Sequence, residues 1–218
     1  AWPPKPGDTV RARARVAGWG SHQLGETAEV HVELTCERGP LAGVAVRYLL
    51  PPGSCDLADI DTDSTGATSD EPRSTVLPEP IACEPKTLLD VRMAAPNDPR
   101  RFAAVARDRN PIHTSRLIAT VAGLDEPIVH GAWTSGAALA AVVDGVASGR
   151  PERISRWSCT YISPVQPGDE LRVEARRTGF AAGSMFVEVT AHARRRPSGE
   201  EDTSFEPVLT CEAVIVAL

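Results

Sequence analysis

Residues Arg107 to Gly136 read RDRNPIHTSRLIATVAGLDEPIVHGAWTSG and set polar side chains beside two turn-like breaks in otherwise apolar sequence. Pro111 fixes its own φ and biases Asn110 away from helical angles, so this loop turns sharply. The turn can bring Asp108 and His113 to one cleft, where Asn110 can brace the loop through its amide. A carboxylate beside an imidazole forms a general acid/base pair, because histidine titrates near neutral pH and the carboxylate orients it. Such a pair can position a water for addition to, or removal from, a carbon chain.

The second half of the stretch, PIVHGAW from Pro127 to Trp133, contains an expected helix start. The sequence GAWTSGAALAAVVDGV, which begins at Gly131, is rich in Ala and long enough for about four turns, with Gly145 near its end. The first N–H groups of such a helix lack intrahelical partners and carry the positive end of its dipole. Gly131 has no side chain, so an oxygen that gains negative charge can approach its N–H closely.

Each of these residues also has a purely structural interpretation. Asp108 and Asn110 favour capping positions, so the D-x-N-P-x-H pattern alone supports a capping turn and a functional site about equally. His130 is more often a hydrogen-bonding residue at a helix start than a catalyst, and Trp133 is expected to be pocket wall or core. His113 and His130 are the two histidines of the stretch, with no Cys or Glu at familiar spacing, so we expect no metal site.

A repeat outside this stretch indicates the strands of the chain. PGDTVRARARVAGW at residues 6–19 matches PGDELRVEARRTGF at residues 167–180, and both alternate apolar with polar residues. This alternation is typical of a strand with one buried face. Each copy is followed by two further alternating runs, so three antiparallel strands appear twice in the sequence.

The two copies differ in what precedes them. The second has helical and polar segments upstream, so residues 84–218 are expected to form a complete module, with a short helix from about Pro99 to Ala106. Residues 1–50 are expected to form a partial module without its helix, whose apolar face is covered by the second module or by sequence absent from this chain. Residues 51–83 are acidic and rich in Pro, Gly and Ser, which is typical of a linker. Because the chain starts at Ala1 without Met, we expect it to be a piece of something longer.

Composition narrows the function classes. The 218 residues carry 23 basic and 29 acidic side chains, and the net charge of -6 gives no basic surface for nucleic acid. The longest apolar segments fall far below the roughly 20 residues of a membrane-spanning helix, so no membrane is expected. Five cysteines without a CxxC pair indicate reduced thiols in the cytoplasm. No G-x-G-x-x-G or Walker loop follows a strand, so no nucleotide cofactor is expected.

The order and spacing of the motifs resemble one enzyme family. Asp-x-Asn-Pro-x-His begins at Asp108, Ala-Gly-Leu follows roughly ten residues later at Ala122, and Pro-Ile-x-His-Gly begins at Pro127. This order resembles the MaoC-like, or R-specific hydratase 2, signature of hot-dog-fold enzymes, and the resemblance covers roughly residues 88–218. It is especially similar to the dehydratase region of large bacterial type I fatty acid synthases or related polyketide synthases, in which hot-dog modules are joined in one polypeptide.

The resemblance implies an α+β hot-dog fold, in which an antiparallel sheet wraps around a long central helix. It also implies dehydration of (R)-3-hydroxyacyl thioesters to trans-2-enoyl thioesters, or the reverse hydration. Asp108 and His113 match the catalytic pair of the family, and Gly131 matches the residue whose N–H binds the thioester oxygen. The supporting or substrate-binding positions of the motif are, in this chain, Asn110, Pro111, His130, Ala132 and Trp133.

No metal or organic cofactor is implied, because the thioester itself acidifies C2. The expected partners are an acyl thioester on an acyl carrier protein or coenzyme A, and a second hot-dog module in a homodimer or pseudo-dimer. Three positions depart from the family pattern. Arg107 stands where Gly is usual, Ser115 where an acidic residue is frequent, and Ala132 where Met is common. A bulky Arg107 can narrow or re-aim the pocket.

Two other functions stay open from the sequence. A non-catalytic structural or acyl-binding hot-dog module is favoured by the lost Gly and the partial module, but such a module has no need for both catalytic side chains. A hot-dog thioesterase more often uses an acidic residue on the helix, and the helix from Gly131 has none before Asp144.

Overall fold

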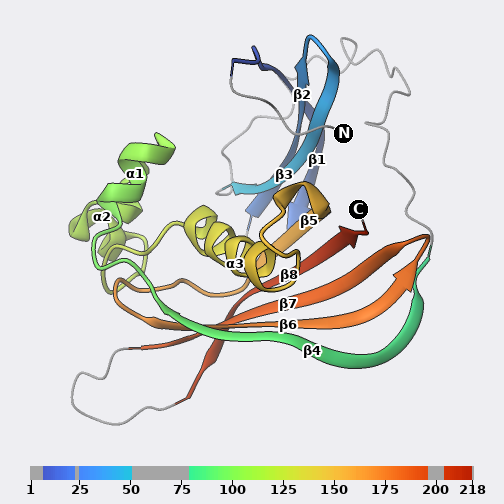
Figure 1. The fold of residues 1–218 in the computed structure, drawn as a ribbon. Coiled ribbons are helices and arrows are strands. Elements are labelled where there is room, and N and C mark those ends of the chain that lie inside the picture. Colours follow the sequence, from blue (N-terminus) through green and yellow to red (C-terminus); the bar gives the residue numbers. More distant parts are fainter. Residues whose placement is uncertain (1–6, 23–24, 51–78, 196–203, 218) are drawn as a thin grey trace. The chain divides into compact units, whose positions relative to one another are not determined.

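The computed structural model describes residues 7–22, 25–50, 79–195 and 204–217 (Figure 1). The chain divides into two compact units, residues 1–77 and residues 78–218, and each has a sheet of its own. Within these described ranges, no helix is both long and apolar enough to cross a membrane.

The first unit contains a three-stranded antiparallel sheet. In spatial order its strands are β1 (Arg11–His22), β2 (Gly25–Cys36) and β3 (Gly39–Leu50). Val16 lies opposite Val30, and Val30 lies opposite Val46, so apolar side chains share one face of the sheet. The described part of this unit contains no helix. The expectation of three antiparallel strands in residues 1–50 is therefore confirmed.

The second unit contains a five-stranded antiparallel sheet. In spatial order its strands are β4 (Ile81–Ala94), β6 (Glu170–Ala181), β7 (Ser184–Arg194), β8 (Glu206–Val216) and β5 (Ile154–Tyr161). The sheet curves around the long helix α3 (Gly131–Gly145), as Figure 1 shows. A curved antiparallel sheet on a central helix is the α+β hot-dog arrangement that the motifs predict.

Helix α3 packs on the sheet through a stripe of small side chains. Thr134, Ala138 and Val142 recur every four residues and are buried. Ala138 and Val142 have no exposed surface, and they share the core with sheet residues such as Leu171 and Leu209. The small side chains allow the helix backbone to lie close to the strands.

The last turn of α3 is held against β4 in the same way. A Cβ atom at Gly145 would lie 2.7 Å from Cδ1 of Leu89, closer than such atoms pack in proteins. Glycine at this position therefore permits the close approach of the helix to β4, which in turn fixes where the first turn of α3 lies.

Short helices connect β4 to α3 and α3 to β5. They are α1 (Arg100–Ala106), η3 (Pro111–His113), α2 (Arg116–Val121) and η4 (Pro151–Arg153). The expected helix near residues 99–106 is confirmed as α1, whereas α2 has no counterpart among the sequence-based expectations. Its N-cap is Ser115, whose Oγ accepts a hydrogen bond from the Ile118 N–H at 3.5 Å. Because Asp suits an N-cap as well as Ser does, capping explains why Ser115 can replace an acidic residue.

The boundary between the units differs from the expected one. Strand β4 begins at Ile81, inside the predicted linker 51–83 and before the expected module start at residue 84. Backbone pairing with β6 extends to Ile81, which lies opposite Phe180. Such pairing depends on main-chain hydrogen bonds and does not need the side-chain alternation used in the sequence prediction. The remainder of the predicted linker, residues 51–78, lies outside the described residues.

Replacing Ala138 with Leu should destabilise the second unit, because the added atoms have no space at a position without exposed surface. Overpacking of this kind costs about 1–3 kcal/mol. Ala140→Leu is the matched control, since Ala140 lies on the exposed face of the same helix. Urea unfolding followed by circular dichroism measures both. Equal stabilities of the two variants would contradict tight packing at Ala138.

Candidate active site

The loop between α1 and η3 is shaped by its own polar side chains. Oδ1 of Asp108 accepts a hydrogen bond from the Asn110 N–H at 3.1 Å, and Oδ1 of Asn110 accepts one from the Ile112 N–H at 3.3 Å. Asn110 is the N-cap of η3, and Pro111 is its first residue. Asn110 thus has the capping role that its residue type favours, while the carboxylate of Asp108 remains exposed.

Arg107 ends helix α1 in the left-handed region, with a φ of 56° and a ψ of 21°. Glycine adopts these angles without the steric cost that a Cβ atom brings. This backbone shape accounts for the Gly that the family signature usually has at this position. The Arg107 side chain is exposed, so the substitution strains the backbone and does not fill the site.

His113 is buried, with 7% of its surface exposed, and its Nδ1 lies 2.8 Å from the carbonyl oxygen of Ile128. A carbonyl oxygen only accepts hydrogen bonds, so Nδ1 carries the proton and Nε2 of the neutral ring keeps a lone pair. Burial lowers the pKa of His113 most, and neighbouring His130 lowers it too, while the Ile128 hydrogen bond and the Asp108 charge oppose this shift. His113 is therefore a neutral imidazole with a basic Nε2 near neutral pH.

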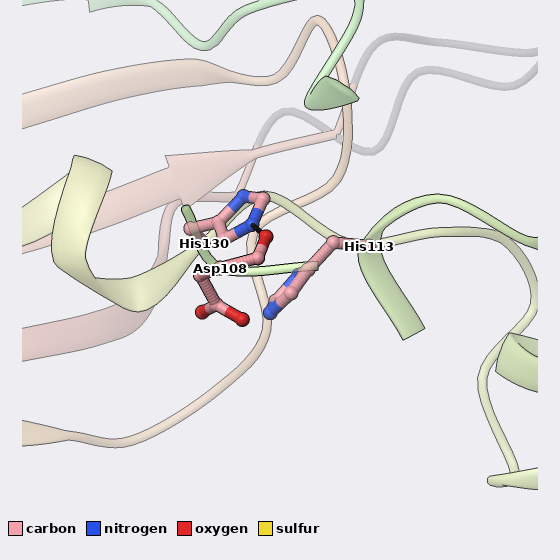
Figure 2. Close-up of side chains that lie close together, drawn as sticks. All are labelled: Asp108, His113 and His130. Atoms are coloured by element: carbon pink, nitrogen blue, oxygen red, sulfur yellow. Dashed lines mark hydrogen bonds between the residues drawn. The ribbon is translucent and has the colours of Figure 1, made fainter. Parts of the chain in front are cut away.

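His130 contacts both members of this pair (Figure 2). It is the N-cap residue of α3 and is 1% exposed. Its ring stacks on that of His113, with centroids 3.7 Å apart and 22° between the planes. Its Nε2 donates to the backbone oxygen of Asp108 at 3.2 Å, and its buried Nδ1 has no hydrogen-bond partner in the described part of the chain. His130 thus holds the ring of one residue and the backbone of the other.

Asp108, His113 and His130 each offer one possible ligand atom, and these atoms lie within 4.8 Å of one another. A tetrahedral metal site needs lone pairs that converge on one ion. The two imidazole rings are stacked, so their lone pairs lie in two nearly parallel planes, and an ion in the plane of one ring lies outside the plane of the other. The arrangement therefore suits an acid/base pair supported by a third side chain better than a metal centre.

A pocket of about 310 Å³ lies beside the first turn of α3. Its walls are mostly apolar and include Ile128, Ile162, Pro164, Val165 and Val208. Gly131 and Thr134 also line it. Thr134 is 3% exposed, and its Oγ1 lacks a hydrogen-bond partner among the residues described. A Cβ atom at Gly131 would lie 2.9 Å from the Tyr161 ring, so glycine permits the close approach of that ring to the helix start.

The other predicted site residues lie apart from this pocket. Ala132 is exposed, and Trp133 packs against the core of the second unit. Neither lines the pocket, whereas Thr134 and Tyr161 do. These two residues were not predicted, because no motif distinguishes Thr134 from an ordinary helix residue and Tyr161 belongs to no motif. The spacing of Thr134 from the apolar residues Ala138 and Val142 was the one signal that could have placed it on the buried face.

Comparison with known protein families gives one match that covers more than half of the chain. The model of the MaoC like domain family matches residues 65–195. Among curated proteins, a fatty acid synthase beta subunit of Emericella nidulans is 37% identical over 105 residues, which are 48% of this chain and 5% of that subunit. The chain thus spans about a twentieth of the length of the curated relatives it matches. The expected similarity to fatty acid synthases is confirmed, although these relatives are fungal and not bacterial.

Solved structures share the fold. A MaoC-like dehydratase aligns with a TM-score of 0.71 at 16% identity, covering 97% of this chain and 71% of that one. A Mycobacterium tuberculosis protein with a double hotdog fold aligns with a TM-score of 0.64 at 19% identity, covering 98% of this chain and 71% of that one. At such identities the likeness shows the fold alone, and it confirms the hot-dog assignment.

Replacing Arg107 with Gly should stabilise the protein by roughly 0.5–1 kcal/mol, since relief of the left-handed strain exceeds the entropy that glycine adds to the unfolded chain. Arg109→Gly is the control, because Arg109 is not among the residues with positive φ, and there glycine should only destabilise. Thermal unfolding of the two variants measures the difference. A loss of stability in both would contradict strain at Arg107.

Stability should fall as the pH drops below the ordinary histidine value of 6.5, partly because of His113. Its pKa is lowered in the folded state, so the unfolded chain binds its proton first and protonation favours unfolding. The contribution of neutral, buried His113 is present above that value and is lost as the pH falls through the window beneath it. Urea unfolding near pH 7.5 and near pH 5.5 tests this. His113→Gln should show a flatter pH dependence, and an unchanged slope would exclude His113 as its source.

Proposed function

The chain belongs to the MaoC like domain family, and from this premise we propose that it dehydrates (R)-3-hydroxyacyl thioesters to trans-2-enoyl thioesters or catalyses the reverse hydration. One observation carries the proposal, which is the placement of the Asp108 carboxylate and the His113 imidazole in one cluster. A helix start and a mostly apolar pocket adjoin this cluster through Ile128 and Gly131. These groups offer a proton acceptor, a carboxylate beside it, and N–H donors for an oxygen that gains charge.

In dehydration, we assign His113 as the base. Its Nε2 accepts the proton from C2 of the substrate, which the thioester carbonyl makes acidic. The resulting imidazolium, stabilised by the Asp108 carboxylate, donates the proton to the C3 hydroxyl as the C3–O bond breaks, and water leaves. The pair returns to its starting state of protonation, so the step requires no cofactor. Hydration follows the same path in reverse.

Gly131 is proposed to bind the thioester oxygen. Removal of the C2 proton moves negative charge onto that oxygen, and the first N–H groups of α3 carry the positive end of the helix dipole. His130 lies at the same helix start, since it is the N-cap residue of α3, and it also contacts His113 and Asp108. One helix start would therefore align the oxyanion donor with the acid/base pair.

The pocket beside α3 is proposed to take the acyl chain. Its volume of about 310 Å³ is at the small end of the roughly 300–1,000 Å³ that ligand pockets span, which favours a short chain. The Thr134 hydroxyl supplies a buried hydrogen-bonding group within these apolar walls.

The similarity to fatty acid synthase beta subunits supports an acyl chain on a carrier protein as the natural substrate, with coenzyme A thioesters as its alternative. A homodimer or pseudo-dimer of hot-dog modules stays a prediction. A cytoplasmic setting is part of the proposal, and the free thiols of Cys36, Cys83, Cys159 and Cys211 agree with it.

A thioesterase has weaker support. Its usual acidic residue would lie on α3, and the first acidic residue of that helix, Asp144, is exposed near the opposite end from Gly131. A non-catalytic acyl-binding module would need no acid/base pair.

Hydration of crotonyl-coenzyme A, followed by loss of enoyl absorbance, tests the proposal. Asp108→Asn and His113→Ala should each lower kcat/KM by roughly 10²–10⁴-fold while leaving the circular dichroism spectrum unchanged. Asp125→Asn is the control, because Asp125 is an exposed aspartate outside the cluster. Full activity of Asp108→Asn and His113→Ala would refute the assignment. Release of free thiol without hydration would instead identify a thioesterase.

A further inference from the structure

Two cysteines face each other across the strand pair β5 and β8. Cys159 lies directly opposite Cys211 in the antiparallel register, and their sulfur atoms are 3.1 Å apart. Both are free thiols. Cys211 is buried, with 3% of its surface exposed, whereas Cys159 is only partly buried.

The backbone geometry at this pair already suits a disulfide. Directly opposite residues of antiparallel strands have Cα atoms about 4.5 or 5.5 Å apart, and disulfides span roughly 4.4–6.8 Å. The register is regular around the pair, since Ser158 lies opposite Glu212 and Thr160 opposite Thr210. A bond between the sulfurs therefore needs side-chain rotation and no change of strand pairing.

The polar neighbours of Cys159 favour its thiolate. The Cys211 thiol donates to the Cys159 sulfur, and the Ser135 hydroxyl of α3 lies 3.1 Å from the same sulfur. Trp157 Nε1 donates to Ser135 Oγ at 3.1 Å and thereby orients that hydroxyl. These hydrogen bonds, that from Cys211 first, lower the pKa of Cys159 to about 7 against the effect of burial. The same contact and burial raise the pKa of Cys211, which keeps its proton.

We propose that Cys159 and Cys211 form an oxidative modification site, in which Cys159 reacts with a hydroperoxide and Cys211 then closes a reversible intrachain disulfide. Reactive cysteines require thiolate character, access and a neighbouring resolving thiol. In this pair Cys159 is the partly exposed residue, and Cys211 is the thiol beside it. The inference does not depend on the proposed enzymatic function.

The oxidation has two steps. With hydrogen peroxide as the hydroperoxide, the Cys159 thiolate attacks one peroxide oxygen, the O–O bond breaks as the S–O bond forms, and the departing hydroxide takes up a proton to become water. The Cys211 sulfur then attacks the Cys159 sulfur. The S–S bond forms, the S–O bond breaks, and the second hydroxide leaves as water with the Cys211 proton. Two thiols are oxidised by two electrons in all, and one hydroperoxide is reduced.

The bond would change what helix α3 contacts. Rotation of the Cys159 sulfur toward Cys211 weakens its hydrogen bond to Ser135, which lies one turn after Gly131. It would also tie β5, an edge strand of the sheet, covalently to β8. The oxidation state of the pair is thereby coupled to the helix whose first turn adjoins the pocket.

Treatment of the full chain with low hydrogen peroxide, followed by alkylation and peptide mass spectrometry, tests the proposal. The expected product is a cross-linked peptide pair carrying Cys159 and Cys211, lost on reduction with dithiothreitol. The oxidised protein should also melt several degrees higher, since the cross-link constrains the unfolded chain. Full alkylation of both cysteines after peroxide treatment would overturn the proposal, as would Cys159 sulfinic acid without a cross-link.

Serine variants of single cysteines test which residues take part in the oxidation. Cys159→Ser and Cys211→Ser should each abolish the cross-link, and Cys159→Ser should also slow peroxide consumption at least tenfold. Cys36→Ser is the control, because Cys36 lies in the first unit, and it should leave both readouts unchanged. If the change at buried Cys211 prevents folding, Cys36→Ser still tests the proposal. That variant should form the same cross-linked peptide pair as the unchanged protein. A cross-link that instead contains Cys36 or Cys83 would refute the assignment.

Discussion

Close packing of helix α3 on the curved sheet determines where the candidate site forms. Ala138 and Val142 have no exposed surface, and Gly145 admits Leu89 where a Cβ atom would clash. These contacts set the depth and direction of the helix, so its first residue, Gly131, arrives beside Tyr161. The pocket lies beside this first turn and is lined as well by the end of β5, the segment that follows it, and β8.

The acid/base pair depends on the same helix through His130. That residue occupies the N-cap position of α3, stacks on His113 and donates to the backbone of Asp108. Burial keeps His113 neutral, and the Ile128 carbonyl selects the tautomer that leaves Nε2 free. The loop after the strained backbone at Arg107 is thus held by the stack on His113, by the hydrogen bond to Asp108 and by the Ile128 carbonyl. Surrounding contacts of this kind allow a costly conformation to persist at a site.

Local signals in the sequence predict helices α1 and α3 of this chain, whereas long-range pairing is not contained in them. The helix from Gly131 and the short helix near residues 99–106 were predicted because propensity and turn residues act within a few positions. The start of β4 was placed too late, since main-chain pairing with β6 carries no alternating pattern. The stack of His113 on His130 could not be predicted, because a stacked geometry depends on distances that spacing in the sequence does not contain.

The sequence by itself determined the types of chemistry that this chain carries, namely a carboxylate and an imidazole on one tight loop, a glycine at a helix start, and thiols without metal spacing. Tertiary structure alone decided which groups from distant parts of the chain meet. Cys159 reaches Cys211 only through strand register, and Tyr161 reaches Gly131 only through the packing of β5 on α3. Residue identity determines the chemistry of a side chain, whereas strand register and packing distance determine which groups it contacts.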